Sequence, residues 1–250
     1  MTDAAALARW TELAASPEYV LLDGFHALKH ALRFGAEVPV VLTSDRPGVR
    51  ALAADLAPDV AAPLDTLLVD VPRAALRALL PRLHATEVAG LARRPRAVDH
   101  LARVAASESP TVLLDNPRNL GNVGAVVRLC AGFGAAGVLT TGDLDPWHPN
   151  ALRGGAGLHF AVPVERVTPD QIPTGRGPLL ALDPEGENLH AVDIPPHAVL
   201  AFGSERQGLS ASVRARADAL VAIPMRPGVS SFNLATSVGM ALFHWQGTHS

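Results

Sequence analysis

The chain has very little cysteine, lysine or aromatic residue. Cys130 is its single cysteine, so neither an internal disulfide nor a thiolate metal cluster can form. Lys29 is the single lysine among 21 lysines and arginines, and aromatic residues make up only 4% of the 250 residues. Most basic residues are therefore arginine, and an arginine is informative only where its position is special. The core must be built mainly from alanine, valine and leucine.

Charge and hydropathy exclude further classes of protein. The formal net charge is −3, whereas a domain that grips nucleic acid by bulk electrostatics is strongly basic. A local basic site stays open. No uncharged apolar run reaches the ~18 residues of a membrane span. The first residues include Asp3, Arg9 and Glu12, which a signal peptide would lack. We therefore expect a cytoplasmic protein without a membrane partner.

Strands and helices alternate along the first half. Apolar runs predict strands at 19–23, 38–43, 67–71 and 87–91, with helices at 24–34, 47–56 and 73–83. This spacing is typical of a small α/β domain. Residues 92–110 are polar and contain proline, which predicts a linker with at most one helical turn near 101–106. We predict a first domain over 1–106 and a second over 107–250.

The second half predicts a parallel sheet. Strands are expected at 111–114, 137–141, 160–164, 178–182, 198–203 and 219–223, and helices at 123–131, 210–217 and 234–245. Most of these strands are continuous apolar runs without alternation, as expected where helices cover both faces of a sheet.

Two patterns in the chain resemble a dinucleotide-binding site and a metal site, but each has a simpler structural interpretation. Gly132-Phe-Gly-Ala-Ala-Gly137 matches a dinucleotide-binding pattern, but a helix precedes it and a strand follows, which is the reverse of what that site needs. We expect Gly132 or Gly134 to end the helix in a left-handed conformation. His26 and His30 have the spacing of metal ligands on a helix, but no third ligand is near in sequence, so we predict a surface or helix-packing pair and no metal.

The first of three informative motifs is Asn116-Pro-Arg-Asn-Leu-Gly-Asn-Val-Gly-Ala-Val-Val-Arg128. Asn119 or Asn122 can cap the helix that begins here. Arg128 lies about 100° beyond Val127 around that helix, off the core face. It is either a solvated arginine or a phosphate or ribose contact near a helix N-terminus, which attracts anions.

The other two motifs each follow an apolar strand. Phe202-Gly-Ser-Glu-Arg-Gln-Gly-Leu209 places Glu205 at the carboxyl end of a strand, where open α/β sheets bind ligands, although an ordinary strand–helix turn would look the same. Ile223-Pro-Met-Arg-Pro-Gly-Val-Ser-Ser-Phe-Asn233 places serines and an asparagine where a helix begins, and Ser231 alone would be a good cap. All three motifs can converge on one edge of one sheet.

In this order the three motifs resemble the signature of the SpoU (TrmH-like) RNA ribose methyltransferases. The resemblance covers 111–250 and includes Arg153-Gly-Gly-Ala-Gly157, which looks like a further family loop. Leu21-Leu-Asp-Gly-Phe-His-Ala-Leu-Lys-His30 resembles, more loosely, the ribosomal-protein-like RNA-binding domain of many members. Two positions depart from the family pattern: Phe232 stands where leucine is usual, and Arg206 where a small residue is common.

The resemblance implies transfer of a methyl group from S-adenosylmethionine to a ribose 2′-hydroxyl of tRNA or rRNA. It also implies a knotted parallel-sheet domain with a deep trefoil knot, and a homodimer. The catalytic residues would be Arg128, Asn122, Ser231, Asn233 and Glu205. The cofactor would contact Thr141, Gly142, Gly203, Ile223, Met225 and Phe232. For Arg128 we favour a fixed cation over a base, because guanidinium, with a pKa above ~12, hardly deprotonates.

We expect RNA to contact a cluster of basic residues outside this site as well. The candidates are Lys29, Arg33, Arg93, Arg94 and Arg96, with a solvated linker as the alternative. A catalytically silent RNA-binding protein of the same fold is the second functional hypothesis, and a nucleotide-dependent oxidoreductase is the third. The RNA, the modified nucleotide and a role in antibiotic self-resistance all stay open.

Overall fold

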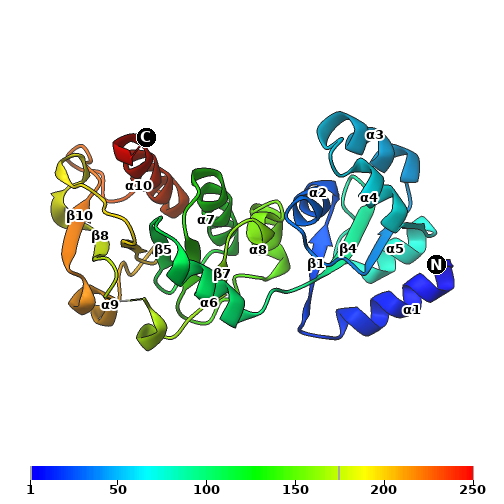
Figure 1. Cartoon of the computed structure of the whole chain (residues 1–250), viewed down its shortest axis with the longest axis horizontal. Coiled ribbons are helices and arrows are strands. Elements are labelled where there is room, and N and C mark those ends of the chain that lie inside the picture. Colours follow the sequence, from blue (N-terminus) through cyan, green and yellow to red (C-terminus); the bar gives the residue numbers. More distant parts are fainter. Residues whose placement is uncertain (1, 174, 250) are drawn as a thin grey trace. The chain divides into compact units, whose positions relative to one another are not determined.

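The computed structural model describes residues 2–173 and 175–249, and contacts divide the chain into two compact units (Figure 1). The first unit runs to Pro95 and also includes Ala156–Ala161. The second unit holds Arg96–Gly155 and the chain from Val162 onward.

The first unit is a four-stranded sheet with helices packed on it. In chain order its elements are α1 Asp3–Ala14, β1 Tyr19–Asp23, α2 Phe25–Arg33, β2 Val40–Thr43, α3 Arg46–Leu56, α4 Ala61–Leu67, β3 Leu68–Asp70, α5 Arg73–Leu79 and β4 Val88–Arg93. The strand order is β1-β4-β2-β3, with β4 antiparallel to both neighbours and β3 parallel to β2. The predicted strands and helices are confirmed with small shifts, whereas α1 and α4 were not predicted.

The helix α1 packs on this sheet through one face. Ala6, Trp10 and Leu13 are buried and lie within one stripe, and the Thr2 side chain accepts a hydrogen bond from the Ala5 amide at the helix start. In the same unit the His30 ring, through Nδ1, bonds the Ala156 carbonyl oxygen at 2.7 Å. Burial lowers the pKa of His30 below its usual 6.5. The predicted packing role of this histidine is confirmed.

The second unit is built on a six-stranded parallel sheet in the order β10-β8-β9-β5-β6-β7. Its strands are β5 Thr111–Leu114, β6 Gly137–Thr140, β7 Val164–Arg166, β8 Leu179–Asn188, β9 Val199–Phe202 and β10 Ala219–Ala222. Its helices are α6 Ala97–Ala106, α7 Leu120–Phe133, α8 Pro149–Gly154, α9 Ala211–Arg216 and α10 Leu234–His249, with 3₁₀ turns Pro169–Gln171 and Leu189–Ala191. A third turn, Leu158–Phe160, belongs to the first unit.

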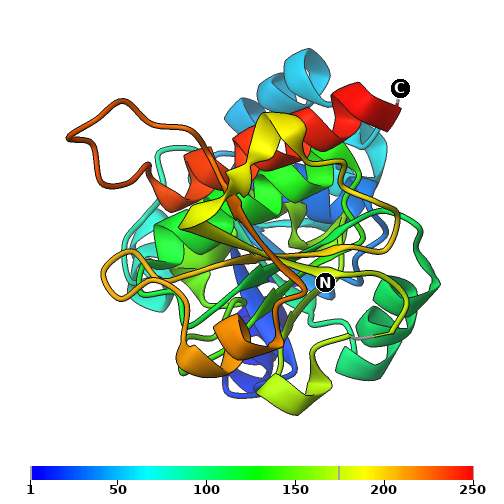
Figure 2. The same cartoon turned by 90° about the vertical axis from the view of Figure 1, so that its left-hand side faces the viewer.

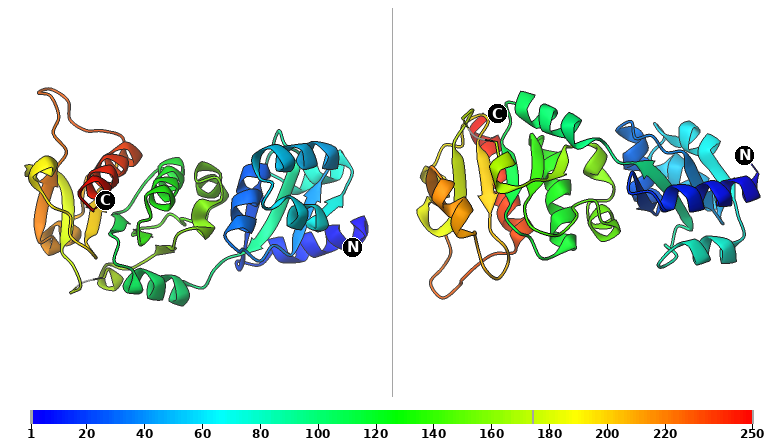
Figure 3. Two further views of the ribbon diagram at one scale, coloured as in Figure 1. Left: turned by 45° about the horizontal axis from the view of Figure 1, so that its top comes forward. Right: turned by 90° about the horizontal axis from the view of Figure 1, so that it is seen from below.

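Helices cover both faces of this sheet, as its apolar strands predict. The helices α7, α8 and α10 lie on one face, and α6 and α9 lie on the other (Figures 1 and 3). The central strands β5, β6 and β9 are buried along their whole length. Gly134 takes a left-handed φ of 73° at the end of α7, and β6 follows it, so the interpretation of the glycine pattern as a helix end is confirmed.

Two predictions for the second unit were wrong. Residues 97–106 are not a linker but the full helix α6, because His100 and Val104 are buried there and His100 Nδ1 bonds the Glu165 carboxylate at 2.9 Å. The strand expected at 160–164 begins only at Val164, because Leu158–Phe160 form a 3₁₀ turn. Among the described residues, none of the helices has both the length and the hydrophobicity that crossing a bilayer requires.

Candidate active site

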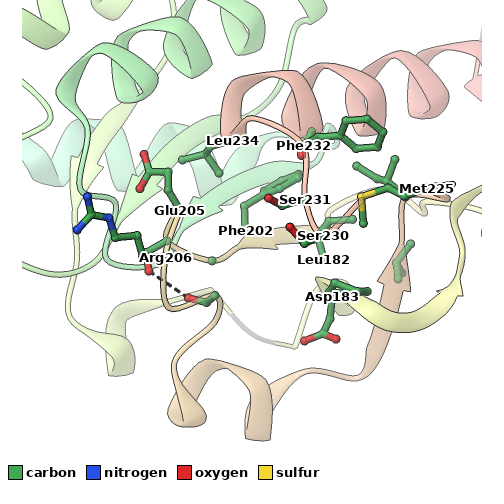
Figure 4. A pocket seen from close by; sticks show the side chains of 17 residues that line it. Leu182, Asp183, Phe202, Glu205, Arg206, Met225, Ser230, Ser231, Phe232 and Leu234 are labelled. Atoms are coloured by element: carbon green, nitrogen blue, oxygen red, sulfur yellow. Dashed lines mark hydrogen bonds between the residues drawn. The ribbon is translucent and has the colours of Figure 1, made fainter. Parts of the chain in front are cut away.

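Three adjacent strands and the loops that follow two of them surround one cavity. It measures about 390 Å³ and lies beside the middle of β8 and at the carboxyl ends of β9 and β10, the edge where ligands bind in open parallel sheets. Its lining comes from these strands, from the loops after β9 and β10 and from the start of α10: Leu182, Asp183, Pro184, Phe202, Gly203, Ser204, Glu205, Arg206, Gly208, Val221, Ile223, Met225, Ser230, Ser231, Phe232, Leu234 and Ser237. Figure 4 shows Met225 and Phe232 toward one end and Glu205 and Arg206 toward the other.

The loop after β9 is folded tightly at Gly203. A Cβ atom at this position would lie within 2.6 Å of the Gly208 carbonyl oxygen, so only glycine fits. Ser204 and Gly208 exchange two backbone hydrogen bonds, of 2.9 and 3.0 Å, and Gly208 takes a φ of 67°. The turn therefore presents Glu205 and Arg206 at its tip.

The structure separates the predicted cofactor residues into two groups. Gly203, Ile223, Met225 and Phe232 line the cavity, together with Ser231. Thr141 and Gly142 are absent from its lining. Thr141 is buried, donates to the Asp115 carboxylate at 2.7 Å and accepts from the Asn116 amide at 2.9 Å. Gly142, with a φ of 81°, packs on Asn116, so these two residues brace the loop after β5 instead.

Side chains from the three motifs form one hydrogen-bonded chain. The Asn122 amide donates to Glu205 Oε1 at 2.7 Å, and the Asn233 amide donates to Asn122 Oδ1 at 3.2 Å. The Arg118 backbone amide donates to Glu205 Oε2 at 3.2 Å. The first, second and third motifs therefore converge, as their sequence positions predict.

The caps at this site come from asparagines. Asn119 Oδ1 accepts from the amides of Gly121 and Asn122, which fixes the start of α7. Asn233 Oδ1 accepts from the amides of Ala235 and Thr236 and starts α10. Ser231 is thus not a helix cap but part of the cavity wall.

Arg128 lies outside the cavity. It is exposed on α7, and its side chain makes no hydrogen bond or ion pair with the residues that the structure describes. Gly124 of the same helix packs on the backbone of α8, and Leu129 contacts Gly239 of α10. At 100° per residue, Arg128 points between these two directions, on the solvent side of α7.

Most of the predicted RNA-binding arginines are already paired with carboxylates. Arg33 binds Asp59 through two hydrogen bonds of 2.6 Å, and Arg96 binds Asp99 at 2.9 Å. Arg93 belongs to β4 and binds both Glu18 and Glu37 at 2.9 Å. Lys29 is half-buried on α2, and Arg94 follows β4. The pairing reduces the net positive charge that this cluster offers to phosphate groups.

A second cavity, which the sequence did not indicate, adjoins the first. It measures about 560 Å³ and is lined only by polar residues: Arg118, Asn119, Ser204, Glu205, Arg206 and Gln207. Ser204, Glu205 and Arg206 line both cavities. The overlooked signal was Arg118, a basic residue between Asn116 and Asn119 in the loop after β5.

A model of the SpoU rRNA Methylase family matches residues 109–243, which span all three motifs. The chain belongs to this family. The resemblance that the motifs carry is therefore confirmed.

Similar proteins include two 23S rRNA 2′-O-methyltransferases. The 23S rRNA (adenosine(1067)-2′-O)-methyltransferase of Streptomyces laurentii is 33% identical over 62% of this chain and 60% of its own length. The 23S rRNA (uridine(2479)-2′-O)-methyltransferase of Streptomyces viridochromogenes is 30% identical over 53% of this chain and 50% of its own. The match thus spans between half and two thirds of these curated relatives.

A solved SpoU structure shares the whole fold. The crystal structure of the SpoU methyltransferase AviRb from Streptomyces viridochromogenes, in complex with AdoMet, aligns over 98% of both chains with a TM-score of 0.79 and 25% identity. The predicted α/β class with a parallel-sheet C-terminal part is confirmed.

Proposed function

We propose that this protein transfers a methyl group from S-adenosylmethionine to a ribose 2′-hydroxyl of tRNA or rRNA. One observation carries the proposal: Glu205, Asn122 and Asn233, one from each motif, form a continuous hydrogen-bonded chain beside the 390 Å³ cavity. Membership of the SpoU family and the named activities of its rRNA-modifying relatives support the same reaction.

The first cavity suits the methyl donor. Its volume lies within the roughly 300–1,000 Å³ of small-molecule sites. Leu182, Ile223 and Met225 offer apolar contact to a base and a thioether, and the tight Gly203 turn exposes backbone to a ligand. Asp183, which is ion-paired with Arg214, offers a carboxylate to an ammonium or hydroxyl group. When bound, the cofactor supplies an electrophilic methyl group.

The protein must align the ribose hydroxyl and stabilise the charge that develops on its oxygen. Glu205 fixes the Asn122 amide, and Ser231 adds a hydroxyl to the cavity wall. We assign Arg128 the role of a fixed cation that stabilises the developing alkoxide. Its guanidinium is exposed and unpaired among the described residues, and so is available to substrate. A guanidinium, with a pKa above ~12, is a poor base.

The finer parts of the assignment belong to the same proposal. We propose a homodimer, in which the exposed Arg128 of one chain can serve a site that it does not line within its own chain. We also propose a deep trefoil knot in 107–250, as the resemblance to the SpoU family implies. The loop 223–233 extends from the body of the second unit (Figure 2). The first domain would bind RNA, and the protein would act in the cytoplasm.

The test is methyl transfer from tritiated S-adenosylmethionine to total RNA from a strain that lacks the gene, followed by mapping of ribose methylation. We expect one or a few ribose positions to gain label only when the protein is added. Binding of labelled S-adenosylmethionine without transfer to any RNA would instead favour the catalytically silent RNA-binding protein.

A further inference from the structure

The arginines that lack a partner are concentrated in the three motifs. Among the described residues, the arginine side chains that make no hydrogen bond or ion pair are those of Arg77, Arg82, Arg103, Arg118, Arg128, Arg206 and Arg226. The last four lie in the motif segments 116–128, 202–209 and 223–233. A general arginine bias in composition gives no reason for unpaired charge to gather there.

Two of these unpaired arginines line the second cavity. Arg118 follows β5 and Arg206 follows β9, and the two strands pair in parallel up to Leu114 and Phe202. Their loops therefore leave the same edge of the sheet side by side. The Glu205 carboxylate lies in this cavity but is already bonded to the Asn122 amide and the Arg118 backbone amide. The two guanidinium groups thus stay available to an anion.

Guanidinium groups are the donors best matched to phosphate, because their planar fork can form two parallel hydrogen bonds. Two such groups against one carboxylate give this cavity a net positive charge, in a chain whose net charge is −3. The first cavity differs, since apolar side chains such as Ile223 and Met225 contribute much of its wall.

We propose that Arg118 and Arg206 bind a backbone phosphate of the substrate RNA next to the ribose that is methylated, so that the second cavity is the subsite for the acceptor nucleotide. This inference rests on the proposed methyl transfer. The acceptor oxygen must approach the methyl group to roughly 3–3.5 Å. The second cavity shares Ser204, Glu205 and Arg206 with the cofactor cavity, so it lies next to the place where the methyl donor would bind.

The first experiment compares Arg118→Gln and Arg206→Gln with the matched control Arg103→Gln. Arg103 is an exposed, unpaired arginine on α6 that lines neither cavity. We expect each cavity variant to raise the KM for RNA about tenfold and to lower the log–log salt slope of RNA binding by about 0.7–0.9. Affinity for S-adenosylmethionine should stay unchanged in Arg118→Gln, because Arg118 does not line the first cavity. Cavity variants that behave like Arg103→Gln would overturn the proposal.

A second experiment separates phosphate binding from base binding. Once the modified nucleotide is mapped, a synthetic RNA hairpin carries an uncharged methylphosphonate at the phosphate on either side of it. We expect one methylphosphonate to impair the wild-type protein as much as the double variant Arg118→Gln/Arg206→Gln does, and to add nothing further in that double variant, as for partners of one contact. Additive effects at both phosphates would show that the arginines bind something else.

The two proposals fail in different ways. A wild-type protein that binds no S-adenosylmethionine and labels no RNA would contradict the methyl transfer. The salt dependence of binding to total RNA, compared between the wild type and the variants Arg118→Gln and Arg206→Gln, would still decide whether these arginines contact phosphate.

Discussion

Asn122 is the residue that connects the three motifs. Its amide nitrogen donates to Glu205, and its amide oxygen accepts from Asn233. An aspartate could not donate to Glu205, and a shorter side chain would reach neither partner. The sequence shows why an asparagine stands near a helix start, but only the folded chain shows that its two ends serve two other loops.

At Arg128 the structure predicts loss of turnover without loss of cofactor affinity. Removing a preorganised charge that stabilises a transition state costs about 10²–10³ in rate, so Arg128→Ala should slow single-turnover methylation by at least about that factor. The affinity for S-adenosylmethionine, measured by calorimetry, should not change, because Arg128 does not line the first cavity.

The matched control for Arg128→Ala is Arg103→Ala, on another exposed and unpaired side chain among the described residues. Arg103→Ala should leave both the methylation rate and the affinity for S-adenosylmethionine as in the wild type. If Arg128→Ala weakened cofactor binding as much as it slowed transfer, the role of a fixed cation facing the substrate would be wrong.

At the scale of elements, α10 depends on Asn233 for two separate contacts. Its Oδ1 caps the helix, and its amide donates to Asn122. Asn233→Asp keeps the capping oxygen, and its negative charge interacts favourably with the helix dipole, so urea unfolding should show stability close to wild type. Methylation should fall, because the donor to Asn122 is lost. Asn233→Ala should lose both, with a stability cost of about 1 kcal/mol. Equal destabilisation by the two variants would contradict this division of roles.

The packing of α7 on α8 depends on Gly124. A Cβ atom there would lie 2.7 Å from the Gly155 amide nitrogen and closer still to the Ala151 carbonyl oxygen. We expect Gly124→Ala to lower the free energy of unfolding by about 1–3 kcal/mol, as overpacking does.

Gly132, on the same helix, is the matched control, because a Cβ atom there meets nothing within 4 Å. Gly132→Ala should raise stability by about 0.5–1 kcal/mol, since alanine favours the helix over glycine. Urea denaturation of both variants measures the difference, and a shift of the same sign in both would refute the close packing of α7 on α8.

At the scale of the whole molecule, the sequence correctly predicted the features that depend on residues close together in the chain. Continuous apolar runs identified the buried strands β5, β6 and β9, and three polar motifs after strands identified one edge of the sheet. The helix α6 was missed because what holds it is a distant partner, Glu165, for a histidine that looks unremarkable in sequence. The position of Thr141 outside the cavity lining could not be predicted for a similar reason, since its partner Asp115 lies 26 residues away.

Carboxylates distant in sequence also determine which arginines have positive charge available to bind phosphate. Arg93 binds Glu18, 75 residues away, and Glu37, 56 residues away, and its guanidinium lies 5.1 Å from the centre of the Tyr19 ring. None of these contacts can be seen in the basic run 93–96. The structure therefore shifts the expected phosphate contacts from this run toward the unpaired arginines of the motifs.

This distribution of charge predicts different outcomes for arginines in the two units. Arg93→Gln should leave the salt slope of RNA binding unchanged, since Glu18 and Glu37 already neutralise Arg93. It should instead lower the free energy of unfolding only slightly, as expected for an exposed ion-pair network. Filter binding across a salt series, with urea unfolding of the same samples, measures both. A slope reduced by about 0.7–0.9 in Arg93→Gln would mean that RNA displaces the two carboxylates, and that the first unit contributes phosphate contacts of its own.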